Sequence, residues 1–386
     1  MVVPLLAVVL AGITFDPYKH VIWIPVQIDG GAMLEFGFDS AAAVSAIEWN
    51  RAEEQKIPFT SLGERLNAGS GDGLARTGRT GAVRLRLPGV VLELPAMGVV
   101  PLRGVSETYG RRMDGLVGAE LLARYVVELD WEERKMILHE PGAYRYAGKG
   151  TSLPLIVAGG MPFLKATVSV PGAKPVEGVF LVDCPHPGTI IMNTPFVRDN
   201  ALLDGARREG MRIVAQYAEG VGGKSAVLHG RVRELAIGPY VLRDPVVGFS
   251  QAKAGSLARA EFAGILGAEV LRRFRVIFDF SREQLILEPK GSLSQAFRYD
   301  ASGLQLRSTG DDFRTFRVTG VVEGSPAEKA KLREGDRLVE IEGKAASGMS
   351  LGEILDVLKQ DGKIVKVKVQ RGDEQVEAEL ALRSLL

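Results

Sequence analysis

Several features that would narrow the function of a protein are scarce or missing in this sequence. A single cysteine, Cys184, excludes an internal disulfide framework. No window reaches the roughly 18 apolar residues that a membrane-spanning helix needs. The formal net charge is only +1, and Lys and Arg form no long run, so nothing indicates nucleic-acid binding. The four histidines lack the spacing of metal ligands, and we expect neither a metal nor another cofactor.

Length, glycine and apolar residues are present in quantity. A chain of 386 residues exceeds what one hydrophobic core usually organises, so two or three domains are expected. An apolar content of 46% with 25% charged residues is typical of a soluble globular protein. The 46 glycines fit many tight turns between short strands, and this favours a mainly β architecture.

The N-terminal segment has two interpretations. Residues 2–11 form an apolar run with the length of a secretory h-region, but no Lys or Arg precedes it. Residues 1–13 are therefore either the remnant of an export signal or a first strand. The first interpretation predicts a periplasmic or extracellular protein, and the second leaves a cytoplasmic location open.

An apolar stretch that ends in an aspartate occurs twice. Residues 35–39 read Glu-Phe-Gly-Phe-Asp, and residues 179–183 read Val-Phe-Leu-Val-Asp. A carboxylate directly after strand-like residues is costly to bury unless something pairs with it, so two of them indicate one shared location. Asp39 and Asp183 are therefore the first candidate site residues.

Two further features recur in the same order. Residues 115–125 read GLVGAELLARY, and residues 264–274 read GILGAEVLRRF. Such a repeat predicts an internal duplication, with one copy in residues 14–146 and the other in residues 147–290. A glycine-rich segment lies between the aspartate and this block in each copy; its glycines are Gly69, Gly71 and Gly73 in the first copy and Gly220, Gly222 and Gly223 in the second.

Local patterns place each aspartate at the end of a hairpin. Residues 20–28 alternate between apolar and other residues, Asp29-Gly30 marks a turn, and residues 33–38 form the second strand. The same layout precedes Asp183. Short helices are expected near residues 47–56 and 194–209.

Two carboxylates held close together cannot both ionise near neutrality, so one keeps its proton. The ionised member of such a pair can activate a water while the other protonates a carbonyl oxygen. That division of labour hydrolyses peptide bonds without a metal, and a flexible hairpin that closes over the substrate would exclude water.

On these residues the chain resembles the aspartic peptidase superfamily, retropepsin-like and pepsin-like, in a two-lobed single-chain form. The family motif is an apolar strand, then Asp-Thr/Ser-Gly, with a later apolar-apolar-Gly strand. The resemblance implies an aspartic-type endopeptidase whose catalytic dyad is Asp39 and Asp183 and whose substrate is polypeptide. It further implies that Ser40 braces the dyad across the lobes and that the glycine-rich hairpins are flaps.

The chain departs from the family motif beside both aspartates. Ala41 stands where the family has Gly. In the second copy Cys184 stands in place of Thr or Ser, and Pro185 in place of Gly. Proline has no N–H to donate, so the pKa of Asp183 should rise if Pro185 fills that position. The alternative function is therefore a catalytically impaired peptidase homologue that acts as a peptide-binding or scaffold protein.

Residues 297–386 resemble bacterial PDZ domains. The run at residues 325–343, SPAEKAKLREGDRLVEIEG, matches the family pattern closely. The resemblance implies that a loop of backbone N–H groups captures a peptide C-terminus beside a helix. The alternative is a docking domain that binds nothing. The residues expected at the peptide site are Gly303, Leu304, Gln305, Leu306, Leu351 and Leu355.

Overall fold

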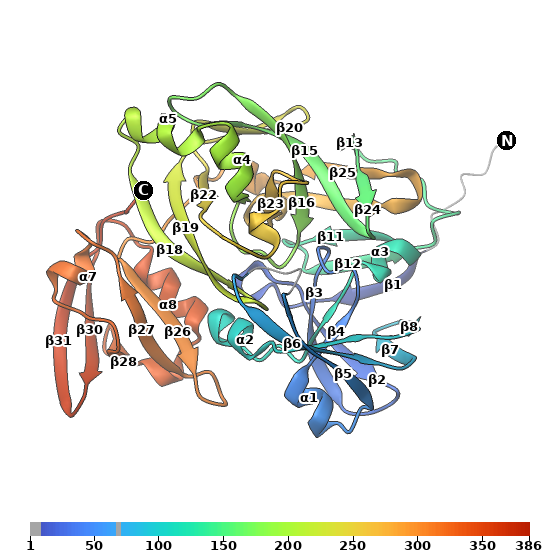
Figure 1. Cartoon of the computed structure of the whole chain (residues 1–386), viewed down its shortest axis with the longest axis horizontal. Coiled ribbons are helices and arrows are strands. Elements are labelled where there is room, and N and C mark those ends of the chain that lie inside the picture. The colour runs from blue at the N-terminus through green and yellow to red at the C-terminus, as the bar shows by residue number, and fades with distance from the viewer. Residues whose placement is uncertain (1–8, 67–70) are drawn as a thin grey trace.

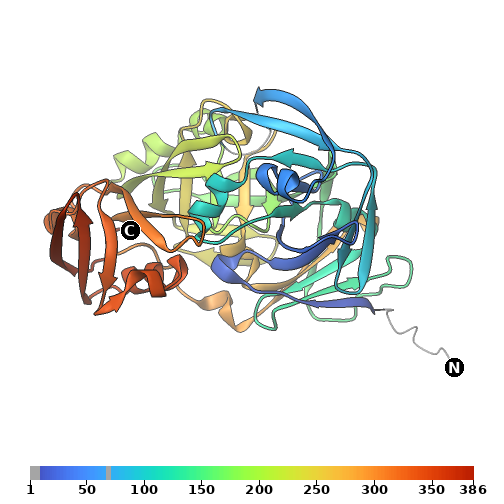
Figure 2. The same ribbon diagram turned by 90° about the horizontal axis from the view of Figure 1, so that it is seen from below.

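The computed structural model describes residues 9–66 and 71–386. It is mainly β, as the sequence predicts, with two lobes built on large sheets and a smaller C-terminal domain. In Figure 1 the first lobe runs from blue to cyan, the second from green to yellow, and the C-terminal domain from orange to red. Figure 2, seen from below, shows the C-terminal domain at one end of the molecule, against the lobes.

The first lobe contains a nine-stranded sheet in the order β5-β6-β9-β4-β10-β3-β2-β7-β8. Alternation shapes its strands: in β7 the valine and both leucines are buried while the arginines are exposed. Asp29 and Gly30 have φ of 49° and 77°, which allows the predicted turn between β2 and β3. The strands are β2 (Trp23–Ile28), β3 (Met33–Phe38), β4 (Ala46–Glu48), β5 (Phe59–Leu66), β6 (Leu74–Thr80), β7 (Val83–Leu87), β8 (Val90–Leu94), β9 (Gly98–Val100) and β10 (Gly115–Val117).

The sheet of the second lobe follows the same plan. Its order is β18-β19-β22-β17-β23-β16-β15-β20-β21, so each strand has a counterpart at the same place in the first sheet, and β14 pairs with β15 outside this order. The strands are β14 (Ile156–Ala158), β15 (Met161–Ser169), β16 (Val176–Asp183), β17 (Ile190–Met192), β18 (Ile213–Gly220), β19 (Gly223–Arg231), β20 (Glu234–Ile237), β21 (Tyr240–Arg243), β22 (Val246–Ser250) and β23 (Gly264–Gly267).

A six-stranded sheet, β1-β12-β11-β24-β25-β13, joins the lobes. β11 comes from the first half of the chain and pairs antiparallel with β24 from the second. Across this pair, Glu128 accepts a hydrogen bond from Arg275 Nε at 2.7 Å. One apolar core extends through both lobes. The strands are β1 (Val9–Thr14), β11 (Val126–Asp130), β12 (Lys135–His139), β13 (Thr151–Pro154), β24 (Phe274–Asp279) and β25 (Gln284–Pro289).

The C-terminal domain has its own sheet and its own core. The sheet order is β26-β27-β28-β30-β31, with β29 beside β28. Helix α8 (Leu351–Leu358) begins at a capping box, in which Ser350 and Glu353 satisfy each other's backbone N–H groups. The strands are β26 (Leu304–Thr309), β27 (Thr315–Val321), β28 (Arg337–Ile341), β29 (Lys344–Ala345), β30 (Ile364–Arg371) and β31 (Glu374–Ala381).

The remaining α-helices are short, and several pack against interior strands of the sheets, as α1 (Trp49–Glu54) does against β4 and β9. The two predicted helical regions are confirmed, and the second is divided into two helices. In the part of the chain that the structure describes, no helix is long and apolar enough to cross a membrane. The helices that follow α1 are α2 (Arg103–Tyr109), α3 (Glu120–Arg124), α4 (Thr194–Asp199), α5 (Leu202–Arg208), α6 (Ala268–Leu271) and α7 (Pro326–Lys329).

Candidate functional site

Two central strands carry Asp39 and Asp183 to the floor of one cavity. Asp39 follows β3, and Asp183 is the last residue of β16. Each of these strands pairs in parallel with a short strand from the glycine-apolar-apolar block, β10 in the first lobe and β23 in the second. Both aspartates line a cavity of about 710 Å³ between the lobes. The repeat thus has a structural counterpart in equivalent positions of the two sheets.

The two carboxyl groups have unequal hydrogen bonding. Asp39 Oδ1 accepts from the N–H groups of Ala41 at 2.9 Å and Ala42 at 3.1 Å. Asp183 Oδ1 accepts from the N–H of His186 at 3.0 Å. Pro185 precedes that histidine and has no N–H, so the second carboxyl group lacks one of the donors that the first one has.

Burial keeps a proton on this pair near neutral pH. Burial raises the pKa of Asp39 to about 6, although the N–H groups of Ala41 and Ala42 oppose the shift. Burial and then the charge of Asp39 raise the pKa of Asp183 well above its ordinary range. At pH 7 the pair therefore offers both a hydrogen-bond donor and acceptors to a group in the cavity.

Ser40 links the two lobes directly beneath the aspartates. Its Oγ donates to the carbonyl of Val182 at 2.7 Å and accepts from the N–H of Cys184 at 3.0 Å. Ser40 and Cys184 are both fully buried. Burial is the main reason that the pKa of the Cys184 thiol lies far above its ordinary value, so this thiol is not a thiolate nucleophile.

The cavity walls are mostly apolar. Two wall residues, Val44 of the first lobe and Ile156 of the second, leave 57% and 43% of their surface exposed. Tyr109, at the end of α2, also lines the cavity, and its hydroxyl donates to the carbonyl of Pro185 at 2.7 Å. Burial, with the nearby charges of Asp183 and Asp39, raises the pKa of this phenol.

The tips of two hairpins meet above the cavity. β5 and β6 form the first hairpin, β18 and β19 the second, and Gly73 N donates to Gly222 O at 2.8 Å between them. A Cβ at Gly71, where φ is +117°, would lie 2.1 Å from the Gly222 carbonyl carbon. Gly220 lines the cavity, Gly223 pairs with it at the turn, and Gly69 lies outside the described residues.

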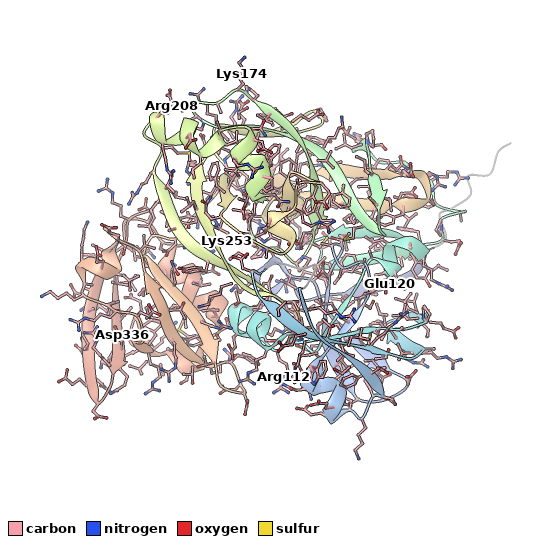
Figure 3. The ribbon with its side chains drawn as sticks, in the orientation of Figure 1. Arg112, Glu120, Lys174, Arg208, Lys253 and Asp336 are labelled. Atoms are coloured by element: carbon pink, nitrogen blue, oxygen red, sulfur yellow. The ribbon has the colours of Figure 1, made fainter. Side chains whose placement is uncertain are left out.

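Asp72 fastens the first tip to the second lobe, which the sequence did not indicate. Its Oδ1 accepts from Ser225 Oγ at 3.2 Å and from the backbone N–H of Lys253 at 3.1 Å and of Ala254 at 3.2 Å. Figure 3 labels Lys253 close to the junction of the lobes. The presence of an acidic residue between Gly71 and Gly73 was the feature of the sequence from which this contact could have been suspected. Tyr109 was missed because it belongs to none of the repeated sequence features.

The expected peptide site of the C-terminal domain lies around β26. Gly303 has a φ of +83°, and its N–H donates to Asp300 Oδ2 at 2.7 Å. Leu304 and Leu351 are buried in the domain core, and Leu306 and Leu355 pack against that core partly exposed. Gln305 Nε2 donates to the carbonyl of Ala215 in the second lobe at 3.2 Å. The domain thus turns this face towards the lobes.

A family model for the PDZ domain matches residues 317–371. The C-terminal domain is a PDZ domain. Two curated relatives, probable CtpA-like serine proteases from Staphylococcus aureus strains COL and N315, are each 36% identical to the chain over 64 residues. That match covers 16% of this chain and 13% of the length of each relative. A solved structure, the photosystem II D1 C-terminal processing protease, has 28% identity and a TM-score of 0.20, over 21% of this chain and 22% of that one.

These relatives correct the predicted enzyme class. They are named as serine proteases, which contradicts the prediction of an aspartic-type endopeptidase, retropepsin-like or pepsin-like, with an Asp39 and Asp183 dyad. A serine protease attacks with a hydroxyl group and needs no pair of carboxyl groups to activate water. The match covers only 16% of this chain, and the chain spans only a small part of the length of these relatives.

Proposed function

We propose that this protein binds polypeptides, with an extended segment held in the cavity between the lobes and a peptide C-terminus held by the PDZ domain. The observation that carries the proposal is the cavity of about 710 Å³ beneath the paired hairpin tips, which has apolar walls and a carboxyl pair on its floor. This volume lies in the range of ligand pockets, about 300–1,000 Å³.

The chemistry of the floor suits a peptide backbone. A protonated carboxyl group donates to a peptide carbonyl, and an ionised one accepts from a peptide N–H. Because Asp39 and Asp183 lie on the floor of one mostly apolar cavity, their bonds to a peptide would form where unpaired polar groups are costly. Apolar side chains of the peptide would cover Val44 and Ile156, which are otherwise open to water.

We also infer that the lobes arose by duplication. The matching strand order of their sheets supports this, together with the repeated aspartate and glycine-apolar-apolar sequences. A duplicated lobe explains why the site takes one aspartate from each half and is closed by one hairpin from each half.

The test uses a fluorescein-labelled ten-residue peptide of alternating apolar residues with an amidated C-terminus. The amide removes the carboxylate that a PDZ domain captures, so its fluorescence polarisation reports on the cavity. Val44→Asp and Ile156→Asp should each weaken binding at least tenfold. Val241→Asp is the matched control, since Val241 is 48% exposed and lies on β21, away from the cavity.

Equal affinity in all three variants would refute binding in the cavity, as would the absence of binding by the unaltered protein. The peptide mass is measured after each incubation. An intact peptide is expected. Progressive cleavage would show that the cavity hydrolyses peptides and does not merely bind them.

A further inference from the structure

Another part of the same chain lies against the strand and the helix at which a PDZ domain would bind a peptide. β26 is the edge strand of its sheet: among the described residues it pairs with no strand except β27, and α8 lies beside it. A peptide bound by β-augmentation adds to such a free strand edge and places its side chains against the helix. In this structure helix α2 of the first lobe packs against β26, as Figure 1 shows between the two domains.

The end of α2 lies between the two walls of the groove. A Cβ added at Gly110, the residue that caps α2, would be 2.5 Å from Leu351 Cβ on α8 and 2.9 Å from Ser308 Oγ on β26. The backbone of Gly110 thus approaches both elements at once. Side chains of a bound peptide would need this space.

Polar contacts hold α2 at the groove. Glu107 Oε2 accepts from Arg307 Nε of β26 at 2.9 Å, and Arg103 donates to the carbonyl of Gly310 at 3.2 Å. Arg112, labelled in Figure 3 just beyond α2, donates to the carbonyl of Asp311 at 3.3 Å. The Glu107 and Arg307 side chains are only 18% and 20% exposed, so their pairing is screened less than a surface ion pair.

A further contact is made at the same end of α8. The N–H of Gly352, in the first turn of α8, donates to the hydroxyl of Tyr18 at 3.0 Å. Lys19 Nζ donates to the carbonyl of Thr108 in α2 at 2.8 Å. The N-terminal segment and α2 therefore face the groove as one surface.

We propose that α2 is an internal occupant of the PDZ groove, and that a peptide with an apolar C-terminus binds there only after α2 leaves. This rests on the peptide binding proposed above for the PDZ domain and adds an autoinhibitory contact to it. When the groove is occupied in most molecules, the apparent affinity for the peptide equals the intrinsic affinity multiplied by the fraction of molecules with a free groove. A groove open in about 1% of molecules binds about 100-fold more weakly.

The same helix connects the groove to the cavity between the lobes. Tyr109 is the last residue of α2, and its hydroxyl bonds to the carbonyl of Pro185, two residues after Asp183. Departure of α2 from the groove frees this tyrosine to move. Capture of a C-terminus by the PDZ domain would in this way alter the wall of the cavity.

The test measures binding of a fluorescein-labelled nonapeptide that ends in Val-Leu with a free carboxylate, with the amidated peptide as the reference for cavity binding. Glu107→Lys places a cation opposite Arg307 and leaves β26 and α8 unchanged. It should tighten binding of the free-carboxylate peptide about tenfold or more. Glu107→Lys with Arg307→Glu restores an opposite-charge pair and should return the affinity towards that of the unaltered chain.

Glu93→Lys is the matched control, because Glu93 also pairs with an arginine, Arg84 at 3.2 Å, but on an exposed surface. It should leave the affinity unchanged. If Glu107→Lys binds the peptide no more tightly than the unaltered chain, the groove is not occluded and the inference fails. If no variant binds it, peptide binding by the PDZ domain fails as well.

A second measurement needs no variant. In α2 the N–H of Ser106 bonds to Leu102 O and that of Gly110 bonds to Ser106 O, both at 2.8 Å. Hydrogen exchange of these amides in the unaltered chain should accelerate when a saturating concentration of the free-carboxylate peptide is added. Unchanged exchange in α2 with the peptide bound would overturn the inference.

Discussion

Pro185 explains much of the asymmetry between the two aspartates that line the cavity. It provides no N–H, whereas the equivalent turn after Asp39 provides the N–H groups of Ala41 and Ala42. A buried carboxyl group with fewer donors holds its proton more tightly. The raised pKa of both groups means that the folded protein binds protons which the unfolded chain has already released.

The pH dependence of stability follows with a defined sign. Below about pH 4 both states are protonated and the pair has no net effect. As the pH rises from about 4 to the pKa of about 6 for Asp39, the unfolded chain releases a proton that the folded protein retains, so stability falls. Asp183→Asn, which removes one ionisable member of the pair, should therefore be more stable than the unaltered protein at pH 8 and differ little from it at pH 4.

Urea unfolding at the two pH values measures this difference. Asp204→Asn serves as the control, since Asp204 is exposed in the second lobe. A gain in Asp183→Asn that is the same at pH 4 and pH 8 would show that the carboxyl pair does not titrate as the structure indicates.

Ser40 is the second residue whose replacement should lower the stability of the lobes. Ser40→Ala leaves the buried carbonyl of Val182 and the N–H of Cys184 without their partner. We expect a loss of about 2–4 kcal/mol in the free energy of unfolding, because each unsatisfied buried group costs about 1–3 kcal/mol. The exposed Ser61→Ala should cost little, and similar urea midpoints for the two variants would argue against the brace.

At the scale of elements, the two hairpins act together because their tips share a backbone hydrogen bond. Gly71→Ala places a methyl group against the carbonyl of Gly222, so the tips must separate. We expect at least fivefold weaker binding of the amidated peptide by fluorescence polarisation. Gly63→Ala controls for backbone strain, since Gly63 has a φ of +78° on the same hairpin but nothing within 4 Å of its added Cβ. Equal losses in both variants would assign the effect to strain alone.

The strands that carry the aspartates could be predicted because each forms a hairpin with a strand that is close to it in the sequence. Alternation and the Asp29-Gly30 turn determine the hairpin before Asp39, and the repeat transfers the same layout to Asp183. The position of α2 was not predictable. Its contacts with Arg307 and Leu351 join residues about 200 positions apart or more, and no local pattern in the helix indicates a partner.

The class of reaction could not be predicted from the sequence pattern either. The resemblance around Asp39 and Asp183 describes how strands present two carboxyl groups, and this geometry alone does not define a reaction. The named relatives correct the predicted aspartic peptidase, while the mainly β fold and the PDZ domain are confirmed.

At the scale of the whole molecule, the distribution of the apolar cores predicts two units of unfolding. One core runs through both lobes, and β11 pairs with β24 between them, whereas the PDZ domain has a separate core. We expect the lobes to unfold in a single transition and the PDZ domain in another.

Hydrogen exchange measured at increasing urea concentrations can separate these units. Amides of β3 and β16, one from each lobe, should become exposed at the same denaturant concentration, and those of β30 at a different one. Independent opening of the first lobe would contradict a shared core.

If the cavity binds a polypeptide as proposed, the joined hairpin tips also limit how fast a long chain can reach it. A polypeptide without a free end near the opening cannot thread beneath the bond between Gly73 and Gly222, so the two tips must part to admit it. At high polypeptide concentration the observed rate of capture should then stop rising and level off at the rate of parting. Stopped-flow mixing experiments should show this limiting rate as a plateau, and its value should be the same for polypeptides of different sequence.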